Sequence, residues 1–159
     1  HARNAWLKGL SPKENREIPP LRYEVAARLK SDFPDLEIIL NGGIKTLDEC
    51  EEHLKTFDGV MLGREAYHNP YLLAEVDQRL FGSDAPVISR SEAVEQLKPY
   101  IAAHLAAGGA MHHVTRHILG LAQGFKGARR FRQLLSVDVH KTNDPLGLLD
   151  QAAELLKGH

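Results

Sequence analysis

Two short motifs in this chain combine glycine with a side chain that can hold an anion. Asn41-Gly42-Gly43 follows the apolar run 36–40, and Gly63-Arg64 follows the run 58–62. Glycine lets backbone N–H groups approach a phosphate without a Cβ in the way, and an arginine can hold a phosphate through two hydrogen bonds. If both runs are parallel strands, the motifs meet at one edge of a sheet. They then form a phosphate site of the kind that follows strands 7 and 8 of a βα barrel.

An ordinary strand-to-helix connection is the alternative explanation of the same residues. Such turns use Asn and Gly frequently, and an arginine after a strand is usually only solvated. The occurrence of two motifs one βα unit apart favours the phosphate site. A helix expected to begin at Thr46 adds a favourable dipole beside the first motif.

A second feature is a basic segment without acidic residues. No Asp or Glu occurs between Leu97 and Val137, although the whole chain carries a net charge of −1. Such a local excess predicts contact with a polyanion, whereas a solvated basic face is the alternative. Arg129 and Arg132 are three residues apart and share one helix face, while Phe131 lies on the opposite, inward arc. The basic residues of the segment are Lys98, Arg116, Lys126, Arg129, Arg130 and Arg132.

The histidines and the cysteine offer other chemistry, which we weigh as less favoured. His112, His113 and His117 share a helical spacing, but no carboxylate or thiol accompanies them, so we predict no metal site. Cys50 is the only cysteine, which excludes an internal disulfide and agrees with a cytoplasmic setting. It lies in an expected helix between two glutamates, whose charges raise a thiol pKa, so we assign it no catalytic role.

The elements that position these residues change character along the chain. Residues 1–20 are expected to form an extended loop. Apolar spacing and capping boxes then predict a helix at 22–33, a strand at 36–40, a helix at 46–56, a strand at 58–62 and a helix at 69–81. After a linker at 82–85, only helices are expected, at 89–107, 111–123, 127–136 and 145–157.

This order predicts an α/β part followed by an all-α part. The 159 residues, 43% of them hydrophobic, fit a globular protein, and no apolar stretch approaches a membrane span. We expect residues 1–82 to be the last βα units of a TIM (β/α)8 barrel and residues 86–159 to be a C-terminal helical bundle. Two strands cannot form a barrel that needs eight, so we expect the other strands upstream of His1.

Three blocks of the sequence resemble the tRNA-dihydrouridine synthases, specifically the A-type enzymes. The first comprises residues 1–6 (HARNAW) and 9–21 (GLSPKENREIPPL), and the second comprises residues 41–44 (NGGI) and 59–66 (GVMLGREA). The third comprises residues 127–132 (GARRFR) and 134–136 (LLS) of the helical part. The blocks occur in order from one end of the chain to the other.

The resemblance implies a cytoplasmic flavoenzyme that binds FMN in a barrel and tRNA with a helical domain. We expect the full-length enzyme to be a monomer. It reduces uridine to 5,6-dihydrouridine in the tRNA D-loop, at position 20 or 20a, with NADPH as reductant. The catalytic cysteine and the flavin-ring lysine of the family would precede His1, so we expect no catalytic residue in this chain. The cofactor-binding residues implied are His1, Asn41, Gly42, Gly43, Gly63 and Arg64. The candidate tRNA-binding residues are Arg3, Lys13, Asn15, Arg16, Arg116, Arg129 and Arg132. For Lys13, Asn15 and Arg16, the alternative is internal pairing with Glu14 and Glu17.

Two other functions stay open at this point. A different flavin barrel that acts on a small pyrimidine would share the strand-end motifs, but it has no need for a basic helical domain. A tRNA-binding module without enzymatic activity would need only the basic helices.

Overall fold

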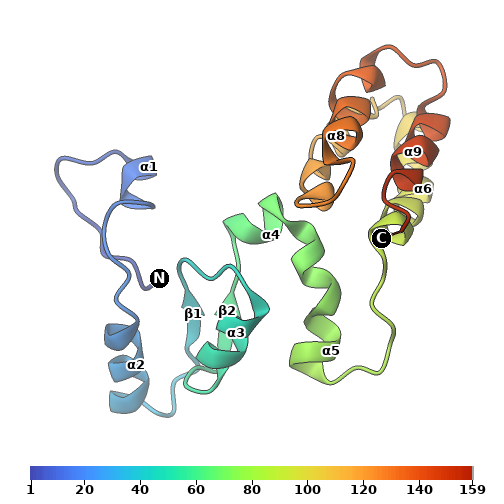
Figure 1. The fold of residues 1–159 in the computed structure, drawn as a ribbon. Helices are drawn as coiled ribbons and strands as arrows, with labels where there is room; N and C mark the ends of the chain where they lie inside the picture. The colour runs from blue at the N-terminus through green and yellow to red at the C-terminus, as the bar shows by residue number, and fades with distance from the viewer. Residues whose placement is uncertain (159) are drawn as a thin grey trace. The chain divides into compact units, whose positions relative to one another are not determined.

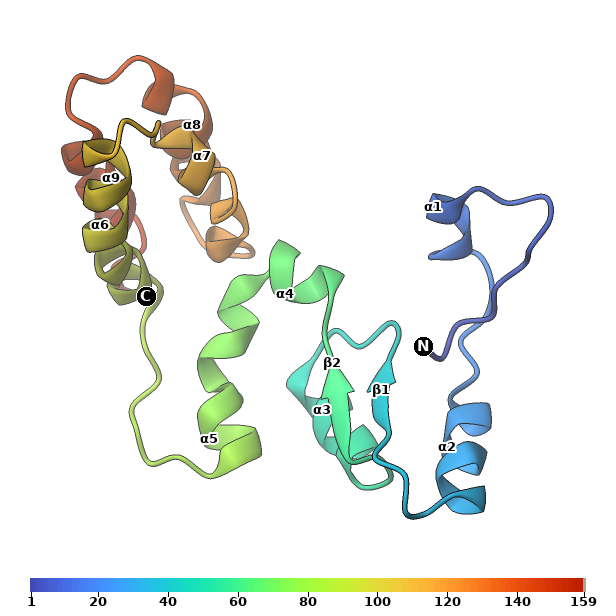
Figure 2. The same ribbon diagram turned by 180° about the vertical axis from the view of Figure 1, so that it is seen from behind.

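The computed structural model describes residues 1–158, which fold into two compact units. The first comprises His1–Glu65 and the second begins at Ala66. Figures 1 and 2 show the strands in the first unit and the long helices in the second. The boundary lies upstream of the linker expected at 82–85, because residues 66–81 pack with the helices that follow them. The assignment of 1–82 to a barrel and 86–159 to a tRNA-binding domain stays a prediction.

The first unit contains one parallel pair of strands. Its elements in order are α1 (Pro12–Asn15), α2 (Tyr23–Asp32), β1 (Ile39–Asn41), α3 (Leu47–Leu54) and β2 (Gly59–Met61). Residues 39, 40 and 41 pair with 59, 60 and 61, and α3 packs against β2. The parallel pair, the connecting helix α3 and its Thr46–Glu49 capping box confirm the expected βα unit. The strands are shorter than expected, since pairing begins only at Ile39.

At the amino end of these strands, a lysine joins three chain segments. The Lys30 ammonium donates to the carbonyls of Pro34 and Leu36 and to the Asp58 carboxylate. The Asp58 carboxylate also accepts the Ile38 N–H at 2.8 Å. These hydrogen bonds, that of Ile38 first, hold the pKa of Asp58 below its ordinary value. The loop that enters β1 is thereby tied to the start of β2.

Residues 1–20 are not wholly extended, so that expectation is wrong in part. Ser11 and Glu14 form a capping box, with Pro12 at the first helical position, and they nucleate the short helix α1. The Ser11 hydroxyl accepts the Glu14 N–H at 3.3 Å, and the Glu14 carboxylate accepts the Ser11 N–H at 2.8 Å. A backbone bridge between Arg3 and Leu21 brings the two ends of this loop together.

The second unit is entirely helical in its described residues. Its elements after α4 (Arg64–His68), which begins in the first unit, are η1 (Pro70–Glu75), α5 (Val76–Phe81), α6 (Arg90–Ala106), α7 (His112–Thr115), η2 (Leu119–Ala122), α8 (Ala128–Ser136), η3 (Asp138–His140) and α9 (Pro145–Glu154). Helix α6 packs against α9, and α8 contacts α7, α9, η2 and η3. The Ser89–Glu92 capping box opens α6, and the helix ends before Gly108, as expected.

Two expected helices of this unit are interrupted. The helix expected at 69–81 begins as the 3-10 turn η1, and Asn69 provides no side-chain cap. The helix expected at 111–123 is divided into α7 and η2. Gly120 lies inside that stretch, where glycine weakens a helix, and a Cβ there would lie 2.2 Å from the His68 carbonyl oxygen. The close approach of α4 to η2 therefore sets the chain path.

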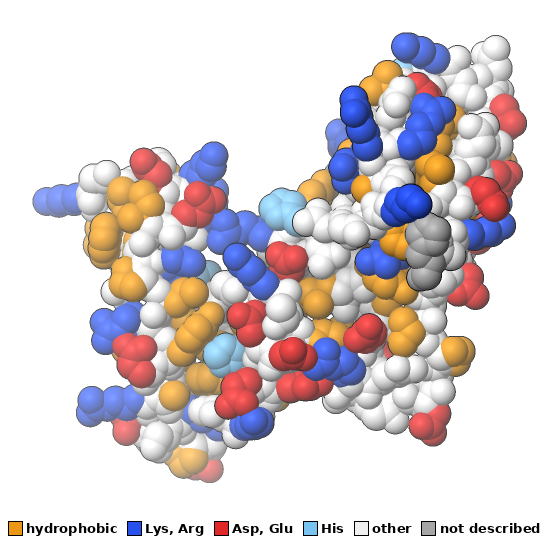
Figure 3. Space-filling view, in the orientation of Figure 1, with side chains coloured by type: hydrophobic (Ala, Val, Ile, Leu, Met, Phe, Trp, Pro, Cys, Tyr) orange, Lys and Arg blue, Asp and Glu red, His pale blue; other side chains and the backbone are white. Residues whose placement is uncertain are grey.

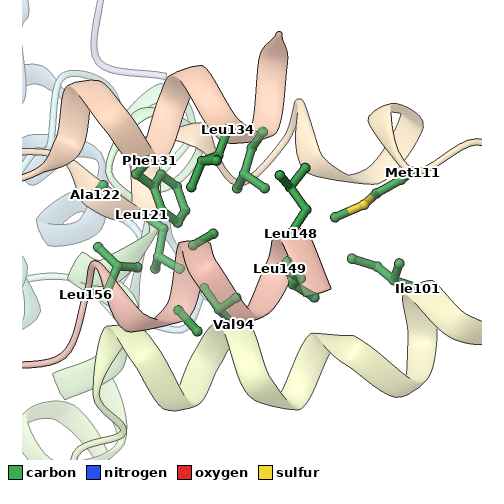
Figure 4. Close-up of a cluster of buried hydrophobic side chains, with 13 residues drawn as sticks. Val94, Ile101, Met111, Leu121, Ala122, Phe131, Leu134, Leu148, Leu149 and Leu156 are labelled. Carbon is green, nitrogen blue, oxygen red and sulfur yellow. The ribbon is translucent and has the colours of Figure 1, made fainter. Parts of the chain in front are cut away.

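One hydrophobic core holds the helices together. Figure 4 shows Phe131 and Leu134 of α8 facing Leu149 of α9 and Val94 of α6. Phe131 and Leu135 are fully buried, which confirms the inward face expected for α8. Across residues 1–158, no helix combines the length and the apolar character needed to cross a membrane.

Candidate phosphate site and basic helical face

The two glycine motifs lie at the same edge of the strand pair. Asn41 is the register partner of Met61, and Gly43 and Gly63 each follow that pair by two residues. Neighbouring strands are about 4.8 Å apart, so the two turns adjoin each other. This confirms the expectation that the motifs meet at the carboxyl ends of parallel strands.

The backbone of the first turn favours glycine at two positions. Gly42 has a φ of 133° and Gly43 a φ of 75°, and a Cβ on Gly43 would lie 2.6 Å from Leu21 Cδ1. The Tyr23 hydroxyl donates to the Gly42 carbonyl, which fixes the turn against α2. Burial raises the pKa of Tyr23, as does the charge of Glu49 to a smaller degree, so the phenol keeps its proton.

In the part of the chain that the structure describes, some N–H groups of this turn have no acceptor and others are paired. Among the described residues, neither the N–H of Gly43 nor that of Ile44 donates a hydrogen bond. The N–H groups of Lys45 and Thr46 are 2.7 and 3.0 Å from the Glu49 carboxylate, which accepts both. The expected contribution of the α3 dipole is therefore largely directed to the helix's own carboxylate, and the loop supplies the free donors.

Arg64, at the second turn, is held on the surface by the long loop. Its Nη1 is 3.2 Å from a Glu17 carboxylate oxygen, and its Nη2 donates to the Arg16 carbonyl at 3.2 Å. Both side chains of the ion pair are 54% exposed, so the guanidinium is not buried against the protein's own carboxylates. Its Nε–H has no partner among the described residues. Arg64 can therefore bind another anion, either in place of Glu17 or together with it.

His1 lies beside the first turn. Its Cε1 is 3.1 Å from the position that a Cβ of Gly42 would occupy, and its Nδ1 accepts the Arg3 N–H at 3.0 Å. A neutral imidazole that accepts at Nδ1 carries its proton on Nε2 and can donate from there. The adjacent Ala2 N–H donates to the Asn41 carbonyl at 2.7 Å, which holds this segment against β1.

The loop residues proposed to bind tRNA differ in whether their side chains already form hydrogen bonds within the chain. Arg3 donates to the carbonyls of Glu17 and Pro19 and fastens the loop, and its Nε is buried without a partner among the described residues. Asn15 is similarly engaged, because its side-chain amide pairs with both backbone groups of Trp6. By contrast, the side chains of Lys13 and Arg16 are exposed and have no ion pair in the described chain.

The basic residues of the second unit also divide into paired and free groups. Arg130 pairs with Asp138 at 2.8 Å, and Lys98 pairs with Glu95 and Asp150. In the described residues of the second unit, three exposed arginines of the acid-free segment form no ion pair. Figure 3 shows Lys and Arg side chains gathered over the region of α8. The three free arginines are Arg116, Arg129 and Arg132.

The structure adds residues that the sequence did not single out. Tyr23 fixes the glycine turn, and Tyr67 contacts His117 with 2.9 Å between the hydroxyl oxygen and Nδ1.

Partial burial lowers the pKa of His112, and the nearby charges of His113, His140 and Arg116 lower it further. In the described part of the chain, no cluster of His, Cys, Asp or Glu is arranged to hold a metal ion.

Comparison with known proteins decides the family. A family model described as Dihydrouridine synthase (Dus) matches residues 1–157. This chain belongs to that family. The family is one of flavin-dependent enzymes built on a TIM barrel, and the parallel βα unit of residues 39–61 is compatible with part of such a barrel. The resemblance of the three sequence blocks is thereby confirmed.

Individual members of the family are closely similar to this chain. Proteins named tRNA-dihydrouridine(20/20a) synthase from Pseudomonas putida and Pseudomonas aeruginosa are 81% and 78% identical over 158 residues, 99% of this chain. The protein of that name from Vibrio cholerae is 55% identical over 152 residues, 96% of this chain. These alignments cover 47%, 48% and 46% of the three relatives, so the chain spans about half their length.

Proposed function

We propose that this chain supplies the phosphate side of an FMN site and a tRNA-binding surface to a tRNA-dihydrouridine synthase. The whole enzyme reduces uridine to 5,6-dihydrouridine in the tRNA D-loop, at position 20 or 20a, with NADPH as reductant. The relatives that carry this activity in their name support the proposal. The observation that carries it is the pair of glycine turns at one edge of two parallel strands.

The residues at this edge fit a phosphate monoester. The free N–H groups of Gly43 and Ile44 and the exposed guanidinium of Arg64 are all donors, which is the set that a phosphate requires. Gly63 has open space where a Cβ would project, with only Met61 Sδ at 3.9 Å, so packing within the chain does not demand glycine there. A phosphate close to the backbone gives a reason for it.

FMN, when bound, supplies the hydride that reduces the uracil ring. The residues of this chain hold and orient the cofactor and do not transfer the proton. Asn41, Gly42 and Gly43 form one wall, Gly63 and Arg64 form the adjoining wall, and His1 donates from Nε2. Cys50 is fully buried inside α3 and takes no part.

The second unit contributes the tRNA surface in this proposal. Arg129 and Arg132 project from α8 on the side opposite the buried Phe131, and no carboxylate of the described chain neutralises them. Such cations contact the RNA backbone and position it without reading its sequence. Arg116, and in the first unit Arg3, Lys13, Asn15 and Arg16, complete the proposed set. Arg3 and Asn15 also brace the loop, so their substitution would affect folding as well.

Flavin content of the whole protein tests the cofactor half of the proposal. Arg64→Ala removes hydrogen bonds from a charged donor, so FMN affinity should fall by about 10-fold or more. Arg28→Ala is the matched control, because Arg28 is an exposed arginine of the same unit that is paired with Asp32 and lies outside the site. Flavin absorbance and fluorescence of the purified proteins give the result. Whole protein without flavin, or equal retention by both variants, would refute the proposed site.

A tRNA-binding module is the second candidate, and the free arginines of the second unit favour it. In that case the chain would bind tRNA with a salt-dependent affinity while the whole protein bound no flavin. A flavin enzyme acting on a free pyrimidine would give the opposite result, with bound flavin and no affinity for tRNA.

A further inference from the structure

A chain of hydrogen bonds links three exposed side chains of the second unit. Arg116 Nε donates to His117 Nε2 at 3.0 Å, and the other ring nitrogen, Nδ1, lies 2.9 Å from the Tyr67 hydroxyl oxygen. The rings of Tyr67 and His117 meet edge to face, with centroids 5.9 Å apart. Fifty residues separate Tyr67 from His117 in the sequence, so the fold creates this group.

The hydrogen bonds determine the protonation of the imidazole. Because Arg116 can only donate, His117 Nε2 must accept and carries no proton. A neutral ring then has its proton on Nδ1, which donates to the Tyr67 oxygen. The Tyr67 hydroxyl proton is therefore left to donate outward. His117 thus orients two donors, one on each side of its ring.

Two packing contacts, one of them a buried hydrogen bond, hold this group in place. The Thr115 hydroxyl donates to the Leu135 carbonyl at 2.8 Å, which ties the end of α7 to α8. Gly120 allows the His68 carbonyl to approach η2, since a Cβ at Gly120 would lie 2.2 Å from that oxygen. The first contact fixes Arg116 and His117, and the second brings Tyr67 to them. The group is therefore set by the packing of the unit and not by flexible surface side chains alone.

The group offers donors only. The Nη atoms of Arg116 have no partner within residues 1–158, and the Tyr67 side chain is about half exposed. No acidic residue lies between Leu97 and Val137 in the sequence. A ligand for this group must supply several acceptor oxygens and negative charge, as an RNA phosphodiester does.

We propose that Tyr67, His117 and Arg116 form one phosphodiester-binding group for the RNA backbone, in which His117 is the positioning residue. The inference rests on the proposed tRNA binding and adds Tyr67 and His117 to it. One imidazole ring separates the Tyr67 hydroxyl from Arg116, so both reach oxygens of the same stretch of backbone. The three residues act as a unit, which distinguishes them from the independent arginines of α8.

Affinity of the full chain for an unmodified tRNA transcript tests the group. Arg116→Ala should weaken binding about 5- to 10-fold and lower the salt slope by about 1. Tyr67→Phe should weaken binding about 3-fold, and the double variant should be little worse than Arg116→Ala. The matched cycle uses Arg132, a free arginine on α8, whose substitution should add fully to that of Tyr67. Additivity in the Tyr67–Arg116 cycle would overturn the coupling.

Variants of His117 separate positioning from folding. His117→Ala should weaken binding about as much as Arg116→Ala. His117→Gln should restore most of the affinity, because its side-chain oxygen can accept from Arg116 in place of Nε2. Equal weakening by both variants, with unchanged thermal unfolding, would refute the positioning role.

The outcome for the unsubstituted chain distinguishes this inference from the proposed function. Absence of tRNA binding by that chain would refute the tRNA surface as a whole. If the chain binds tRNA and Arg132→Ala weakens it, but changes at Tyr67, Arg116 and His117 have no effect, then the phosphodiester-binding group alone is wrong.

Discussion

Glu17 should compete with the cofactor phosphate for Arg64. Its carboxylate is 3.2 Å from Arg64 Nη1, and both side chains are 54% exposed. An ion pair this exposed contributes only about 0.2–1 kcal/mol, since water and salt screen it. Glu17→Gln keeps the shape of the side chain and removes the charge. We therefore expect FMN affinity to rise by about 1.5- to 5-fold, which is the same free energy expressed as a binding ratio.

The assay is titration of the flavin-free whole protein with FMN, followed by the quenching of flavin fluorescence. Arg64→Ala should weaken binding about 10-fold or more, and adding Glu17→Gln to it should change nothing further, because the competitor acts only through Arg64. Urea unfolding should show Glu17→Gln within about 1 kcal/mol of the unsubstituted protein.

The sign of the effect makes this a strict test. Weaker FMN binding by Glu17→Gln would mean that the carboxylate orients Arg64 toward the cofactor, and the competition argument would be wrong. A gain in affinity that survives in the Arg64→Ala background would show that Glu17 repels the phosphate directly.

Three further changes test the folding arguments. Gly43→Ala should lower the free energy of unfolding by about 2–4 kcal/mol, because the backbone there is strained for alanine and the new Cβ would contact Leu21. Gly9 has a similar φ and open space around it, so Gly9→Ala should lower the free energy of unfolding by only about 1–2 kcal/mol. Equal urea midpoints for the two variants would contradict the contact with Leu21. Thr115→Val should lower the free energy of unfolding by about 1–3 kcal/mol, because it removes the buried hydrogen bond to the Leu135 carbonyl. Ser136→Ala removes an exposed hydrogen bond to the Arg132 carbonyl and should lower it far less. Similar losses in thermal melts would mean that the burial of the Thr115 hydrogen bond does not matter. The pKa of His112 is lower in the folded protein than in the unfolded chain, so at mildly acidic pH the unfolded chain takes up a proton at His112 more readily than the folded protein does. The free energy of unfolding should therefore fall as pH drops below about 6.5. His112→Gln should flatten that dependence in melts taken between neutral and acidic pH, and an unchanged slope would refute it.

Local sequence signals predicted much of the fold correctly. Thr46 with Glu49 and Ser89 with Glu92 open their helices as expected, since a capping box satisfies backbone donors within four residues. Phe131 lies in the core because its helical arc is the apolar one. The same kind of signal at Ser11 and Glu14 does not by itself predict a helix, because a helix of four residues has no apolar periodicity to accompany the capping box.

Contacts between distant segments could not be predicted in this way. Arg64 finds Glu17 across 47 residues, and no local pattern relates the two. The self-capping of α3 by Glu49 was visible in the sequence as a capping box, yet its effect on the anion site emerges only when the N–H groups of residues 43–46 are assigned their partners. Site residues are thus easier to nominate from a sequence than their available donors.

The hydrogen bonds of Lys30 and Asp58 make the two ends of the strand pair chemically different. These hydrogen bonds satisfy the loop carbonyls at the amino end, whereas at the carboxyl end the N–H groups of Gly43 and Ile44 have no acceptor among the described residues. Substitution of Lys30 or Asp58 should therefore change the stability of the unit, whereas substitution of the exposed Arg64 should mainly change which anion the unit binds. An engineer could adjust thermal tolerance and ligand preference of this fold separately, by working at opposite ends of the same two strands.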